Sequence, residues 1–166
     1  MSLIQSVQFY LPELLIAIKE TFIMMGIAIM SCLVFGLPLG IMMFDSNPQI
    51  KGKRHFSYWL FNFFVTFVRS FPYLLFVITL IPLTRLLLGR AFGPYPASFP
   101  LSIIGVVIVA RLVEQVLLDV PVETRALADA LGATKWQYIW HFLLPEARSG
   151  LILAYTTAIV SLVSYS

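Results

Sequence analysis

The feature that most constrains this chain is a run of about 24 residues, 21–44, without a charged side chain. About 20 apolar residues in a helix are enough to cross the hydrocarbon core of a bilayer. Charged residues bracket the run, with Lys19 and Glu20 before it and Asp45 after it. Over the whole chain 60% of the residues are hydrophobic and only 11% are charged, whereas soluble domains carry about 25% charged residues. The chain is therefore neither an ordinary soluble domain nor a disordered one.

Three more apolar runs predict an all-α, polytopic integral membrane protein with about four transmembrane helices. We expect one membrane domain, residues 1–166, with spans at about 14–44, 56–88, 97–118 and 146–166. The second run is longer than a single span requires and is broken at Arg69, Pro72, Pro82 and Arg85. It is therefore either one long kinked helix or a shallow segment followed by a span from about residue 71.

The Lys and Arg residues set the expected orientation, because loops that are rich in these residues stay in the cytoplasm. The polar loop 45–55 contains three of them and the region 111–148 contains four. The other side of the membrane would receive only Lys19, Arg85 and Arg90. We therefore expect a multi-pass cell-membrane protein whose N-terminus lies outside.

The last apolar run, residues 149–166, is barely long enough for a span. It ends without the Lys or Arg that commonly anchors a helix at the membrane interface. At this stage we expect a polypeptide that is cut short.

The orientation places segment 119–145 in the cytoplasm, and this is the only extended segment with a soluble-like composition. Residues 122–131 are rich in Ala and Leu, which favour helix. Pro121 suits a helix start, and Gly132 can adopt the left-handed conformation that ends a helix. The pattern predicts a short helix that closes at this glycine.

A second short helix is expected directly after the first. Thr134 is followed three residues later by Gln137, which fits a capping box. Pro145 would then restart the chain into the last span. Two short helices of this kind either seat in a groove of a partner or serve only as a packing connector between two spans.

Several classes of function are excluded by what the sequence lacks. A single cysteine, Cys32, excludes a disulfide framework, and two distant histidines, His55 and His141, argue against a metal site. We find no Gly-rich phosphate loop and no arrangement of nucleophile and base, so we expect no cofactor and no enzymatic activity. The net charge of +3 is too small to indicate a nucleic-acid-binding protein.

Arg111 and Glu114 are three residues apart, so they lie on one helical face and are able to pair.

Four polar residues within apolar runs are candidates for a translocation pathway. A charged side chain in hydrocarbon is costly, so Arg69 should face a cavity, a partner helix or the interface. Arg69 and Ser70 either line or brace a pathway or anchor a helix end at the head groups. Ser161 and Tyr165 are four residues apart and share a helical face. They either line a pathway or hydrogen-bond to another helix.

The cytoplasmic segment ALADALGATKWQYIWHFLLP, residues 126–145, resembles the signature of ABC-importer permeases. That signature is written EAA, three residues, Gly, nine residues, Ile-x-Leu-Pro. Gly132, Leu144 and Pro145 fall at the required spacing, and Ala128 matches the third position. Ala126 stands where the family has Glu. The departures at the remaining motif positions are Leu127 for the first Ala and Phe142 for Ile.

The resemblance extends over most of the chain from about residue 20. Three segments are similar to the methionine-importer branch of these permeases: RSFPYLLFVITLIPLTR (69–85), VARLVEQVLLDVP (109–121) and SLVSYS (161–166). Permeases of this kind have five spans, so this chain would supply four of them.

The resemblance implies a permease subunit of an ATP-driven importer for methionine or a related amino acid. It implies as partners two ATP-binding subunits, a second permease copy, an extracytoplasmic substrate-binding protein and the lipid bilayer. It places Tyr165 on the pathway. Contact with the ATPase would involve Glu123, Ala126, Leu127, Ala128, Asp129, Ala130, Leu131, Gly132, Ala133, Leu144 and Pro145, with Glu123 one turn before the missing Glu.

A second hypothesis stays open at this point. The chain could be a non-transporting membrane scaffold, or an inactive permease fragment. A scaffold has no need for the double helix with Gly132 and Leu144-Pro145, and this feature favours the transport reading.

Overall fold

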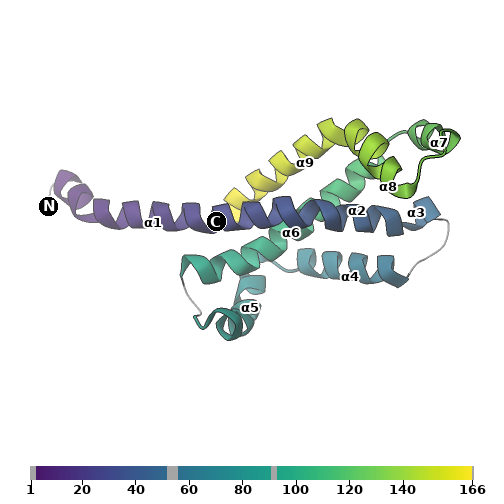
Figure 1. The fold of residues 1–166 in the computed structure, drawn as a ribbon. Coiled ribbons are helices and arrows are strands. Elements are labelled where there is room, and N and C mark those ends of the chain that lie inside the picture. The colour runs from purple at the N-terminus through teal and green to yellow at the C-terminus, as the bar shows by residue number, and fades with distance from the viewer. Residues whose placement is uncertain (1–2, 52–55, 91–92, 166) are drawn as a thin grey trace.

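The computed structural model describes residues 3–51, 56–90 and 93–165. Within these residues the chain forms helices joined by short turns and contains no strand, as predicted for an all-α protein (Figure 1). Lys53 and Arg54 of the predicted basic loop lie outside the described residues. The helices are α1 (Leu3–Ser31), η1 (Cys32–Gly36, π-helical), α2 (Leu37–Ser46), α3 (Pro48–Lys51), α4 (Phe56–Ser70), α5 (Tyr73–Leu88), α6 (Pro94–Leu118), α7 (Val122–Ala130), α8 (Lys135–Gln137), η2 (Tyr138–Leu143, π-helical) and α9 (Leu144–Tyr165).

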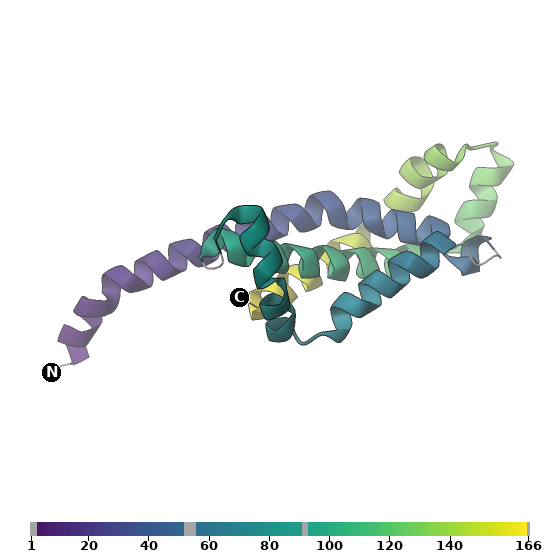
Figure 2. The ribbon, with the colours of Figure 1, turned by 90° about the horizontal axis from the view of Figure 1, so that it is seen from below.

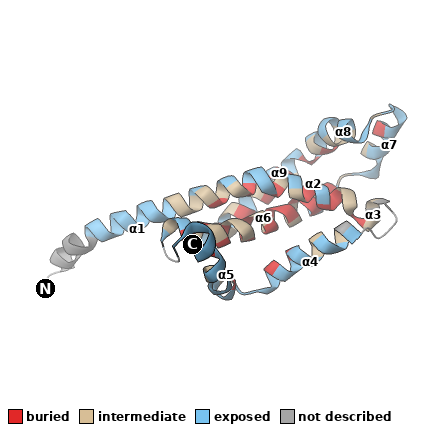
Figure 3. Ribbon diagram, turned by 60° about the horizontal axis from the view of Figure 1, so that its bottom comes forward, coloured by how far each residue is buried: buried red, intermediate tan, exposed pale blue. Residues whose placement is uncertain are grey.

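Helix α6 lies at the centre of the molecule, and the other long helices pack around it (Figure 3). Pro94 begins α6, where the fixed φ angle of proline suits a helix start. The rod formed by α1, η1 and α2 crosses α6 at close range, because Gly36 and Gly40 face Val109 and Val113 without a side chain between them. The N-terminal half of α1 projects beyond the other helices, and residues 11–22 are exposed (Figure 2).

The chain turns by 111° between α4 and α5. Pro72 lies in the turn with ψ of 136°, and a proline disfavours helical geometry at the residue before it, here Phe71. The range 56–88, expected as one kinked helix or as a shallow segment and a span, is thus two helices at this angle. The turn brings the end of α4 and the start of α5 against the middle of α6.

The described residues contain three helices that are long and apolar enough to cross a membrane. These are Leu11–Ser46, Pro94–Leu118 and Lys135–Tyr165, and a fourth span results if the bent pair Tyr58–Ser70 and Tyr73–Leu88 counts as one. This confirms the prediction of a helical, multi-pass membrane fold with about four spans. The exact limits of each span stay a prediction.

One expectation about the cytoplasmic segment is wrong. Pro145 does not start a separate helix, because the chain is helical without a break from Lys135 to Tyr165. A proline removes one backbone donor from a helix. Just before it the chain adopts π-helical geometry, in which the Leu144 N–H bonds to the Ile139 carbonyl oxygen. This wider turn accommodates the proline, so the second short helix continues directly into α9.

Candidate functional site

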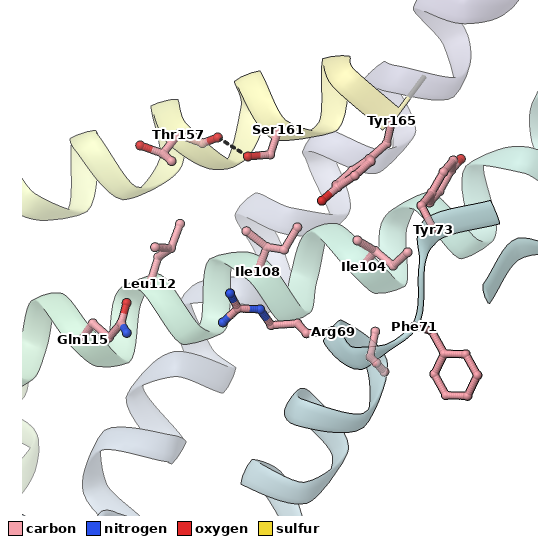
Figure 4. A pocket seen from close by; sticks show the side chains of 11 residues that line it. Arg69, Phe71, Tyr73, Ile104, Ile108, Leu112, Gln115, Thr157, Ser161 and Tyr165 are labelled. Atoms are coloured by element: carbon pink, nitrogen blue, oxygen red, sulfur yellow. Dashed lines mark hydrogen bonds between the residues drawn. The ribbon is translucent and has the colours of Figure 1, made fainter. Parts of the chain in front are cut away.

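A cavity of about 360 Å³ lies where the α4–α5 turn meets α6 and α9 (Figure 4). Arg69 enters it from the last turn of α4 and Tyr73 from the first turn of α5, while Ser161 and Tyr165 enter from α9. Three of the four predicted pathway residues therefore meet at one place. Ser70 does not line the cavity; its hydroxyl donates to the Thr66 carbonyl oxygen at 2.8 Å.

The lining of the cavity combines apolar side chains with one cation and several neutral polar groups. The neutral groups are Gln115, Thr157, Ser161 and the two tyrosine hydroxyls, and the Ser161 hydroxyl donates to the Thr157 carbonyl oxygen at 2.8 Å. The rings of Tyr73 and Tyr165 stack with centroids 5.2 Å apart at an interplanar angle of 26°. Among the described residues that line the cavity, Arg69 is the one that carries a charge. The site can therefore hold a small ligand that carries a negative group and an apolar part.

In segment 119–145, the proposed coupling segment, the end of α7 and the start of α8 have the predicted form. Helix α7 begins after Pro121, and its end is closed by Gly132 at a φ of +70°. The N–H of Ala133 bonds to the Ala128 carbonyl oxygen at 3.0 Å, as in a Schellman motif. The capping box at Thr134 is present, since its hydroxyl accepts from the Gln137 N–H and the Gln137 side chain accepts from the Thr134 N–H.

The predicted coupling residues do not all share one environment. Ala128 is 1% exposed on α7, which packs against η2, while Leu144 packs against the main apolar core. Ala133 is half-buried. The others are exposed: Glu123, Ala126, Leu127, Asp129, Ala130, Leu131, Gly132 and Pro145. Several large apolar side chains of this segment are more than half exposed, namely Val122, Leu127, Leu131, Trp136 and Trp140. This is the surface that a partner would cover.

A buried polar cluster joins α4, α6 and the end of α2, near the end of the molecule that carries segment 119–145. Glu114 of α6 is 0% exposed. Its Oε1 accepts from Asn47 Nδ2 at 2.8 Å and its Oε2 from Arg111 Nη1 at 2.6 Å, which confirms the predicted pairing of Arg111 and Glu114. Asn47 Nδ2 also donates to the Tyr58 hydroxyl at 3.3 Å, and Arg111 Nη1 donates to Asn62 Oδ1 at 3.5 Å.

Sequence reasoning missed the contribution of α4 to this cluster, although a signal was present. Tyr58, Asn62 and Arg69 are spaced by four and seven residues, so they form a polar stripe along one face. The opposite face carries a ladder of largely exposed aromatic rings with neighbouring centroids 4.9–6.0 Å apart: Phe56, Trp59, Phe63, Phe67 and Phe71. A membrane helix with its polar stripe inward and its apolar ladder outward points its functional groups at the protein interior.

Residues 36–166 match the family described as binding-protein-dependent transport system inner membrane component. The chain belongs to this family. The match starts at Gly36, where the rod formed by α1, η1 and α2 crosses α6, and it includes the cavity, the polar cluster and segment 119–145. The resemblance to ABC-importer permeases is thereby confirmed, and the chain is a multi-pass permease component of a membrane transport system.

Relatives with specific names agree with this assignment. The chain is 34% identical to the D-methionine transport system permease protein MetI of Yersinia pestis over 89% of this chain and 68% of that protein. It is 35% identical to the corresponding probable permease of Pasteurella multocida, with the same coverage of both chains. Its fold matches an inward-facing structure of the MetNI methionine ABC transporter with a TM-score of 0.82 and 32% identity, over 89% of this chain and 68% of that one.

Proposed function

We propose that this chain is the permease subunit of an ATP-driven importer for methionine or a related amino acid. The observation that carries the proposal is the identity of 34% with MetI of Yersinia pestis over 68% of that protein's length. In this proposal the chain pairs with a second copy of itself and with ATP-binding subunits, which hydrolyse the ATP. An extracytoplasmic binding protein delivers the substrate.

The proposed coupling surface is the exposed side of α7 together with the turn at Gly132. Small side chains at Ala126 and Ala130 would let an ATP-binding subunit approach the backbone closely, and Leu127 and Leu131 would fill its groove. Glu123 lies in the first turn of α7, where a carboxylate suits the positive end of the helix. The exposed apolar side chains support a docked partner, because a solvated connector has no need for them.

The continuous helix from Lys135 to Tyr165 offers a route from this surface to the cavity. Its first turns pack against α7, and its last turns carry Ser161 and Tyr165 (Figure 1). If the ATP-binding subunits displace α7, α7 would push on the start of the helix 135–165. Because a helix moves as a stiff element, the far end of this helix, which forms part of the cavity wall, would shift as well. We propose Arg69, Ser161 and Tyr165 as pathway residues, and Ser70 as a support at the end of α4.

The proposal is tested by deleting the gene in its own organism and measuring uptake of radiolabelled methionine. We expect the loss of energy-dependent uptake and its recovery with the intact gene. Gly132→Trp should not restore uptake, because a bulky residue is strained at this φ and obstructs the docking surface. Gly132→Asn is the matched control and should restore it, since Asn tolerates the left-handed conformation. Unchanged uptake after deletion would refute the transport role and favour the scaffold or inactive fragment.

A further inference from the structure

Arg69 is a charged side chain in the last turn of α4 for which the described residues supply no counterion. It lies one residue before the end of α4, and its side chain extends toward α6 beside Ile108 (Figure 4). Among the described residues no carboxylate pairs with it; the nearest charged cluster uses Glu114 for Arg111 instead. A charged group within an apolar protein is costly unless a counterion or water meets it. Arg69 is an exposed residue that presents its guanidinium group to the cavity, where an anionic ligand would serve as its counterion.

The rest of the lining complements an amino acid rather than a simple anion. Two stacked tyrosine rings, Tyr73 and Tyr165, form one wall. A thioether sulfur makes favourable contacts with aromatic rings at about 5 Å. Gln115 and the hydroxyl of Thr157 supply oxygen atoms that can accept from an ammonium group. The volume of about 360 Å³ lies within the range of small-molecule sites.

We propose that Arg69 binds the carboxylate of the transported amino acid, while Tyr73 and Tyr165 pack against its apolar side chain. The guanidinium group presents paired donors that match the two oxygens of a carboxylate, and such charge-assisted bonds are stronger than neutral ones. The inference rests on the proposed transport function and names the substrate group that its cavity recognises. It requires an α-carboxylate and admits several apolar side chains.

The test measures occupancy of the cavity directly, because the binding protein would select for the carboxylate in any uptake assay. Ser161→Cys places a thiol in the cavity wall, and the native Cys32 is only 2% exposed. The full chain, co-expressed with its ATP-binding subunit and reconstituted in lipid vesicles, is labelled with a maleimide with and without free methionine. The chain without the introduced cysteine gives the background.

We expect saturating methionine to slow labelling about tenfold or more, since an occupied cavity shields the thiol. Methioninamide, which lacks the carboxylate, should protect poorly at the same concentration. Adding Arg69→Gln should raise the concentration of methionine needed for half-protection by about tenfold to a hundredfold. Arg69→Lys should keep part of the protection. Arg85→Gln is the matched control, because Arg85 is also in the last turn of its helix but lines no part of this cavity.

Three results would overturn the inference. These are equal protection by methionine and methioninamide, full protection in Arg69→Gln, and no protection by methionine in the unsubstituted Arg69 background. The first comparison needs no change at Arg69, so a folding defect of a variant does not affect it. Uptake that depends on the gene, together with any of these results, rejects only the role of Arg69. Loss of the gene without effect on uptake rejects the transport function itself.

Discussion

At the scale of single residues, Glu114 and Arg69 represent two different ways of keeping a charge within an apolar protein. Both oxygens of Glu114 accept hydrogen bonds, from Asn47 and from Arg111, so its burial is compensated inside the chain. Arg69 has no such partner in the part of the chain that the structure describes, and it faces a cavity instead. The first arrangement is expected of a group that holds helices together, and the second of a group that meets a ligand.

We predict that Glu114→Gln destabilises the protein by about 3 kcal/mol, because it leaves the Arg111 charge without its counterion. The measurement is thermal or denaturant unfolding of the purified protein in detergent. Glu146→Gln, at an exposed carboxylate in the first turn of α9, is the control and should change stability by no more than about 0.5 kcal/mol. Equal effects of the two substitutions would show that the buried cluster adds no stability.

At the scale of helices, the packing of the rod formed by α1, η1 and α2 depends on how closely this rod approaches α6. A methyl group added at Gly40 would lie 2.6 Å from the Val113 Cβ and 2.9 Å from the backbone oxygen of Ala110. One added at Gly26, in the same rod, would meet no atom within 4 Å. The two glycines therefore separate the effect of helix propensity from the effect of packing.

We predict opposite signs for the two alanine substitutions. Gly40→Ala should destabilise the protein by about 1–3 kcal/mol, because α2 and α6 must move apart. Gly26→Ala should stabilise it by about 0.5–1 kcal/mol, since Ala loses less conformational entropy than Gly in a helix. Unfolding in detergent measures both. Stabilisation by Gly40→Ala would contradict the close crossing of the helices.

Local features of the elements could be predicted from the sequence, and features set by distant neighbours could not. The turn at Gly132 and the capping box at Thr134 depend on residues a few positions apart, and both have the predicted form. The sequence places Asn47 only within the polar loop 45–55, because its partner Glu114 is far away in the chain. The continuity of the helix past Pro145 also escaped prediction, because a π-helical turn depends on the packing around it rather than on a motif.

At the scale of the whole molecule, the two segments expected in the cytoplasm lie together. Figure 1 shows α3, α7 and α8 together at one end of the molecule, with the start of α6 pointing toward the opposite side. Contacts support this arrangement, since Ile50, Arg125 and Tyr138 line one common pocket. Two predicted spans, 56–88 and 97–118, separate segment 45–55 from segment 119–145. An even number of crossings returns the chain to the same side of the membrane, which agrees with this placement. The N-terminus outside remains a proposal that rests on the Lys and Arg distribution.

We predict that Arg90→Cys is labelled by a membrane-impermeant maleimide added outside intact cells, and that Lys135→Cys, outside the proposed coupling residues, is labelled only after the membrane is opened. Both side chains are exposed, so accessibility of the thiol depends on the compartment. The buried Cys32 gives little background. The reverse pattern would invert the topology and place the coupling surface on the wrong side for an ATP-binding subunit.

The π-helical turns have a consequence for comparing this chain with its homologues. A turn closed by bonds between residues five apart holds one residue more than an α-helical turn. Removing one residue from Cys32–Gly36 would restore the α-helical hydrogen-bond pattern. It would leave α2 in place and rotate α1 by about 100° about its axis. Residues 11–22 are exposed, so only the part of α1 near Ala28 would have to repack. Homologues that differ by a single-residue gap at this point should share the fold, with the gap inside a helix rather than in a loop.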